Sequence, residues 1–231
     1  MTLSKKTAFL VPSFLLLATT AHAHVSIISG PTTANASQEV TFGVGHGCDG
    51  ADTVKVTVDI PAGVTSVRGL SSDFGPTTYT KNGANVTSIT WQKPDASVYA
   101  EDSQYYKLTV RLKAPNAPFT KLLMPARQTC KDAQGNLTTV YWTTAPDSDA
   151  GGEPAPVLYV LPTKSPGWNK WTVPAPVAAK DMVGFFKDAQ IVWRGSSAYS
   201  ANATTVAQIK GEAGVTELTD LKAGDEIWVR Y

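Results

Sequence analysis

The sequence predicts a mainly β protein: an antiparallel two-sheet β-sandwich of the immunoglobulin or cupredoxin type, followed by a small C-terminal α+β extension. Short stretches that alternate apolar and polar residues, such as Asp52 to Ile60, are typical of strands with one face on a core. Turns rich in Gly, Pro, Asn and Asp separate these stretches, and no helical periodicity occurs before residue 162. With 231 residues, 42% of them hydrophobic, the chain can bury a sizeable core.

Residues 1–23 have the three parts of a secretory signal peptide: Lys5 and Lys6, an apolar run, and the small-x-small pattern Ala21-His22-Ala23. Cleavage after Ala23 makes His24 the first residue of the mature chain. We therefore expect a periplasmic or secreted protein, with no membrane anchor in the mature chain because no second apolar stretch approaches spanning length. Loss of the two lysines leaves a formal charge of 18 minus 19, or −1, which favours neither nucleic acid nor an anionic membrane.

The sandwich is expected over residues 24–162. Its strands are predicted at 24–28, 39–46, 52–60, 64–68, 76–81, 86–92, 104–113, 122–130, 137–144 and 157–161. If the first two pair antiparallel around a loop centred near residue 34 or 35, His24 faces the neighbourhood of Val44 to His46. This register would bring the two histidines of the mature chain close together.

The stretch 163–176 is dense in proline and is predicted to be a linker, with Trp168 and Trp171 packing at the domain junction. Beyond it, residues 177–231 are predicted to form the small α+β extension. It has a strand at 189–193, a short helix at 203–210 and a closing strand at 226–231. So few residues make a marginal core, so we expect the extension to pack on the sandwich.

A mature N-terminal His24 predicts a copper site, because its α-amine and its imidazole Nδ1 close a chelate ring without help from the fold. Both nitrogens lose their protons near neutral pH, and such ligands favour Cu(II). His46, in the glycine-rich segment 44–50, is the candidate third nitrogen ligand. The alternatives are that His24 is only the first polar residue after cleavage and that His46 is a turn residue.

Cys48 and Cys130 are the two cysteines of the chain, and export favours a disulfide between them. The alternative is a thiolate pair that binds copper. A serine hydrolase triad is not credible with two histidines outside any nucleophile motif, and the sequence has no phosphate loop or dinucleotide fingerprint.

Several motifs in fixed order resemble the YcnI copper-binding family of exported bacterial proteins, over roughly residues 24–161. The matching segments are His24 to Ile27, Gly45 to Cys48, Val58 to Val64, Tyr141-Trp142, and Glu153 to Val157. The resemblance implies a β-sandwich that binds one Cu(II) through a single-histidine brace with a tryptophan close to the metal. His24 and Trp142 match those positions. Sequence pattern alone would make Trp142 a core aromatic of a sandwich strand.

We therefore expect a copper-binding protein, a Cu(II) chaperone, trafficking or storage protein, and not an enzyme. Its expected partners are the copper ion and other periplasmic or membrane copper-transport proteins. Two alternatives remain open at this point. One is a copper oxidase or monooxygenase of the histidine-brace type, and the other is a metal-free envelope adhesion or structural module.

Overall fold

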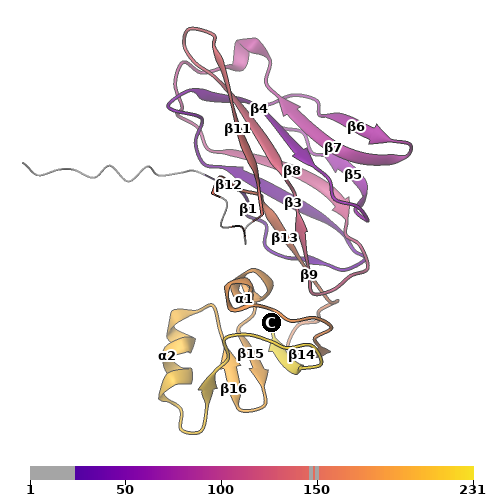
Figure 1. Cartoon of the computed structure of the whole chain (residues 1–231), viewed down its shortest axis with the longest axis vertical. Coiled ribbons are helices and arrows are strands. Elements are labelled where there is room, and N and C mark those ends of the chain that lie inside the picture. Colours follow the sequence, from indigo (N-terminus) through magenta and orange to yellow (C-terminus); the bar gives the residue numbers. More distant parts are fainter. Residues whose placement is uncertain (1–23, 146–147, 149–150) are drawn as a thin grey trace, which may run out of the picture.

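The computed structural model describes residues 24–145, 148 and 151–231, and the predicted signal peptide 1–23 lies outside them. These residues form a β-sandwich and a smaller α+β unit next to it along the long axis of the molecule (Figure 1). The predicted mainly β fold with a C-terminal α+β extension is confirmed.

Two sheets make the sandwich in the described part of the chain. The first, in strand order, consists of β1 (Val25–Ile27), β3 (Ser37–Val44), β8 (Tyr106–Lys113) and β5 (Thr65–Gly69). The second consists of β12 (Glu153–Pro154), β11 (Leu137–Thr144), β10 (Ala126–Lys131), β4 (Asp52–Asp59), β7 (Asn85–Gln92) and β6 (Thr78–Asn82). A short 3₁₀ turn, η1 (Asp95–Ser97), follows β7. Neighbouring strands are antiparallel except for β11 and β12.

The core lies between these sheets and follows from the alternation in the sequence. In β4 the valines Val54, Val56 and Val58 point inward and are buried, while the intervening residues from Lys55 on are partly exposed. Phe42 of the first sheet and Trp91 of the second meet with ring centroids 6.1 Å apart. Both side chains are fully buried, so the two sheets share one apolar core.

The predicted strand 122–130 is wrong in one respect, because it is two strands. β9 (Thr120–Leu123) joins β13 (Val157–Leu161) and β2 (Thr32–Thr33) in a small sheet, whereas β10 pairs with β4 and β11. Pro125 separates them, since it has no N–H to continue a ladder. The Met124 N–H donates to the Pro156 carbonyl over 2.9 Å. The chain thus changes sheets at this point.

The C-terminal unit is a five-stranded sheet with two helices. Its strand order is β14 (Trp168–Thr172), β18 (Glu226–Arg230), β15 (Ile191–Arg194), β16 (Ser197–Tyr199) and β17 (Thr216–Glu217). The helices are α1 (Ala179–Phe186) and α2 (Ala203–Gly211). The predicted linker 163–176 is therefore too long. Exposed and partly buried residues alternate over 168–172, which is typical of an edge strand. This segment pairs with β18 as part of the sheet.

The extension packs against the sandwich through aromatic contacts. Trp171 lies 6.0 Å from Phe119, and Tyr159 of β13 lies 4.8 Å from Phe185 of α1, between ring centroids. Trp171 is at the junction as predicted, but Trp168 is 49% exposed on the outer face of the sheet, so that part of the expectation is wrong. None of the helices in the described residues has the length and apolarity needed to cross a bilayer.

Candidate metal centre

His24 directly precedes β1, and the pairing of β1 with β3 decides what it faces. Val25 pairs with Val44 and Ser26 with Gly43, which centres the antiparallel pair between residues 34 and 35. The register predicted from the sequence is confirmed. Continuing the same register places His24 opposite the segment that begins at Gly45.

The ring of His24 lies beside Trp142, with centroids 5.5 Å apart and an interplanar angle of 48°. β1 and β11 belong to different sheets, and each lies at or next to a sheet edge, so the two residues meet where the sandwich closes. Trp142 is 4% exposed and belongs to the sandwich core, whereas His24 is exposed. Trp142 is therefore both a core aromatic and the neighbour of His24.

Gln128 of β10 fixes the indole of Trp142 and was not found by the sequence reasoning. Trp142 Nε1 donates to Gln128 Oε1 over 3.1 Å. Gln128 Nε2 donates to the His46 carbonyl over 2.7 Å and to Thr53 Oγ1 over 2.8 Å. Gln128 is 1% exposed, so its amide links the indole to the His46 segment inside the protein.

His46 is half-buried, and its Nδ1 lies 2.6 Å from the Gly47 carbonyl oxygen. A carbonyl only accepts, so Nδ1 donates this hydrogen bond, and in the neutral ring Nε2 is the nitrogen with a lone pair for a metal. The structure joins the His46 backbone to Trp142 through Gln128. A role for His46 as a ligand stays a prediction.

The segment after His46 is held rigidly by a turn and by a disulfide. Asp49 and Gly50 both have positive φ, 49° and 83°, and Cys48 and Ala51 exchange backbone hydrogen bonds across them. A Cβ on Gly47 would lie 1.7 Å from the Ala51 carbonyl oxygen, so only glycine fits there. The predicted disulfide between Cys48 and Cys130 is confirmed, with the Cα atoms 5.7 Å apart. It ties this segment to β10.

Glu153 is a second residue that the sequence reasoning missed, since it entered only as part of a family motif. It is half-buried on β12, at the edge of the second sheet, and pairs in register with Trp142 of the parallel strand β11. Directly paired residues project from the same face of a sheet, so its carboxylate lies on the face from which Trp142 meets His24. Glu153 is the one acidic residue of the paired strands β11 and β12.

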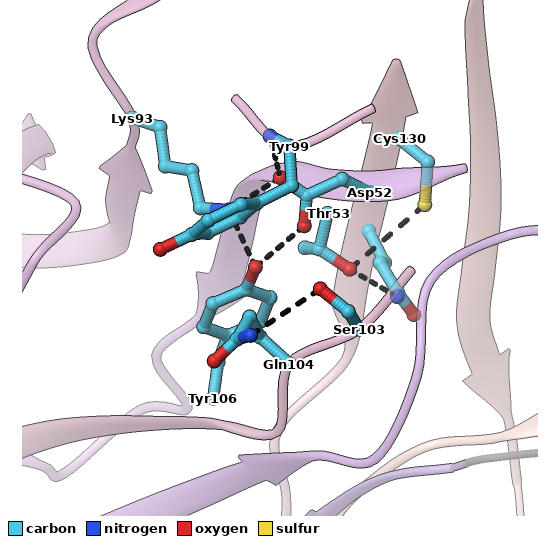
Figure 2. A network of polar contacts seen from close by, with 9 residues as sticks. Asp52, Thr53, Lys93, Tyr99, Ser103, Gln104, Tyr106 and Cys130 are labelled. Atoms are coloured by element: carbon cyan, nitrogen blue, oxygen red, sulfur yellow. Dashed lines mark hydrogen bonds and ion pairs between the residues drawn. The ribbon is translucent and has the colours of Figure 1, made fainter. Parts of the chain in front are cut away.

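A buried ionic network supports the start of β4 (Figure 2). Asp52, which is fully buried, accepts hydrogen bonds from Lys93 Nζ at 2.6 Å, from the Tyr106 hydroxyl at 2.5 Å and from the Tyr99 N–H at 2.9 Å. Burial, and then the contact with Asp52, raise the pKa of Tyr106, so the phenol keeps its proton and donates. The network fixes the residue that precedes Thr53, the partner of Gln128.

These residues suit a brace and not a multi-histidine cage. Within residues 24–145, 148 and 151–231, no three His, Cys, Asp or Glu side chains are grouped to hold a metal ion. A brace needs only one such side chain, because the amine of the same residue is its second ligand. Cleavage at the predicted site before His24 would create that amine on the exposed surface beside Trp142. The donor set therefore fits a Cu(II) brace.

The fold defines the class as an immunoglobulin-like β-sandwich, in agreement with a solved structure to which the chain is similar. The family model described as "Domain of unknown function (DUF1775)" matches residues 24–160, which is more than half of the chain. The chain therefore belongs to this family, whose domain is that of the YcnI family. A comparison with curated proteins found no match.

Among solved structures, the chain is similar to an uncharacterized protein from Nocardia farcinica with an immunoglobulin-like fold. The two are 25% identical with a TM-score of 0.50, over 61% of this chain and 99% of the other. More distant is the major pilin subunit BcpA of Bacillus cereus, 10% identical with a TM-score of 0.36, over 65% of this chain and 42% of the other.

Proposed function

We propose that the protein is an exported Cu(II)-binding protein that carries one copper ion as cargo at its mature N-terminus, for delivery, trafficking or storage. One observation carries the proposal: the exposed imidazole of His24 lies 5.5 Å from the buried indole of Trp142. Because the signal peptide is predicted to end at Ala23, processing would add the α-amine at this same place.

The groups around His24 supply nitrogen and oxygen donors for a copper ion. The amine and Nδ1 of His24 are the two brace nitrogens, and Glu153 is a candidate oxygen donor. The indole N–H of Trp142 is donated to Gln128, so this residue offers its ring and not a lone pair. An indole beside the metal limits the open coordination positions that an oxidase or monooxygenase needs. We therefore propose a binder and not an enzyme.

The decisive experiment compares the correctly cleaved protein with a form that keeps one additional residue before His24. The extra residue turns the amine into an amide, which binds Cu(II) only after losing a much less acidic proton. We expect the Kd for Cu(II) to rise by orders of magnitude in the extended form and in His24→Ala. His46→Ala separately tests whether His46 is a ligand: unchanged affinity would show that it is not.

Equal Cu(II) affinity in the cleaved and extended forms would refute the brace. Oxygen consumption with ascorbate that exceeds the free-copper background, or turnover of a polysaccharide, would favour the oxidase class. Absence of any copper affinity in the cleaved protein would favour a metal-free envelope module. Periplasmic localisation and transfer to other copper-transport proteins are part of the proposal, and are tested by fractionation and by copper transfer assays.

A further inference from the structure

The C-terminal sheet has one covered face and one bare face, and the bare face carries tryptophans. Ile227 and Val229 of β18 point into the core of this unit, where they pack with residues of α1. Trp168, Trp193 and Trp228 point the other way and line a shallow hollow of about 400 Å³. We call these three residues the tryptophan platform. It lies outside residues 24–160, which the family model matches.

The platform is built on three neighbouring strands, so its rings are held by the sheet and not by loops. Trp193 of β15 pairs directly with Trp228 of β18. Trp168 of β14 pairs with Arg230, two residues further along β18, and is therefore diagonal to Trp228. Ordinary strand spacing and rise put the backbones of Trp168 and Trp193 about 12 Å apart. The result is an extended, open surface.

Tryptophan side chains with this much exposed surface are unusual on a protein. Trp168 and Trp228 are 49% and 47% exposed, and these three residues are half of the six tryptophans in the chain. A contiguous aromatic patch that the fold does not cover marks a binding surface more often than a packing defect. The copper site makes no use of it, because it lies on a different unit.

The charged side chains around the platform indicate which class of ligand it could bind. The Arg230 guanidinium carbon lies 5.8 Å from the Trp168 ring, and Lys170 Nζ lies 5.9 Å from the Trp228 ring. Lys170 also pairs with Glu226 at 2.9 Å. The rim thus offers both donors and an acceptor and carries little net charge. Nucleic acid and anionic lipid are recognised by accumulated cations, so they fit this rim poorly.

We propose that the tryptophan platform binds an extended, β-linked glycan chain. The flat C–H faces of pyranose rings would stack on the indoles, and ring hydroxyls would bond to Lys170, Arg230 and Glu226. Equatorial β-linkages give a straight ribbon, which an open sheet face can follow, whereas a coiled α-linked chain suits a concave groove. The platform would hold the exported protein at a polysaccharide surface, independently of copper.

The test is titration of the full mature chain with chitohexaose, a β-1,4-linked probe, by calorimetry, with the α-linked maltohexaose beside it. We expect saturable binding of chitohexaose only. Trp168→Ala and Trp228→Ala should each weaken it roughly tenfold or more, since each removes one stacking surface. Trp228→Tyr, which keeps an aromatic ring, should retain part of the affinity. The matched control is Val183→Ala, an equally exposed apolar residue of α1.

Unchanged thermal unfolding and Cu(II) affinity in the tryptophan variants would show that they are folded. The proposal is overturned if chitohexaose does not bind the folded protein, if maltohexaose binds as tightly as chitohexaose, or if the alanine variants bind chitohexaose as tightly as the parent. It is also overturned if the platform instead mediates binding to vesicles of phosphatidylglycerol and phosphatidylcholine, to an oligo-dT strand, or to a second copy of this chain in sedimentation.

Discussion

Replacing Gln128 with leucine tests whether the buried amide holds the proposed copper site together. Leucine has a similar volume but cannot accept from Trp142 Nε1 or donate to the His46 carbonyl, so both groups lose their partner. An unsatisfied buried polar group costs about 1–3 kcal/mol, so the free energy of unfolding should fall by roughly 2–6 kcal/mol. The variant also removes the hydrogen bond from Gln128 Nε2 to Thr53 Oγ1. Thr53 Oγ1 keeps its weak contact with Cys130 Sγ at 3.9 Å.

Urea unfolding at neutral pH measures this loss, with Gln92→Leu as the control because Gln92 is an exposed glutamine on β7, two strands away from β10 in the same sheet. The control should stay within about 0.5 kcal/mol of the parent. Cu(II) affinity should also fall in Gln128→Leu, because the indole and the His46 segment lose their common anchor. If both variants unfold at the same urea concentration and bind Cu(II) equally, Gln128 does not position the site.

Two further predictions concern the same site. Trp142→Phe should abolish most of the Cu(II)-dependent quenching of tryptophan fluorescence, because the paramagnetic ion would sit beside this ring, whereas Trp91→Phe, in the core on β7, should leave the quenching in place. Retained quenching, affinity and spectrum in Trp142→Phe would remove Trp142 from the site. Reducing the bond between Cys48 and Cys130 should lower the free energy of unfolding by up to roughly 4.5 kcal/mol on the chain-entropy model, for a sequence separation of 82. An unchanged urea midpoint after reduction, with both thiols shown to be free, would contradict this.

The sequence could predict the elements whose physics is local. Alternation of valines predicts β4, because the period of a strand is visible within a single segment. The position of His24 relative to Val44 follows from one assumption, that two adjacent strands pair around the loop between them. The disulfide follows from having two cysteines in a chain that is predicted to be exported. Each of these inferences needs no knowledge of the tertiary structure.

Helix α1 was missed because its start carries no capping signal. Ala178 stands at the N-cap and makes no side-chain hydrogen bond, whereas Asn202 caps α2 by accepting from Thr204 and Thr205. The available signal was the spacing of Met182, Phe185 and Phe186, which are buried on one face. In the same way, strand β14 was obscured by prolines on both sides of it.

The residues of the proposed copper site that escaped prediction are those whose role depends on partners distant in sequence. Gln128 occupies an inward strand position where an apolar residue is expected, and its partners are 14, 75 and 82 residues away. Glu153 faces Trp142 only because β12 pairs parallel with β11, a pairing that no local pattern indicates. A polar residue in an inward strand position was the one available signal for Gln128.

The proposed copper site combines a rigid base with an exposed ligand, and this division would suit the proposed role of a protein that gives up its metal. Trp142, Gln128 and Cys130 are buried and interlocked, so the surface that His24 contacts is fixed before any ion binds. The proposed brace would lie on His24, the first residue after the predicted cleavage point and exposed to solvent, where a second protein could reach the ion without unfolding the sandwich. Pre-organisation of the buried part lowers the entropy lost on binding, while exposure of the brace leaves exchange open. A cage of buried histidines would hold copper more tightly and transfer it more slowly.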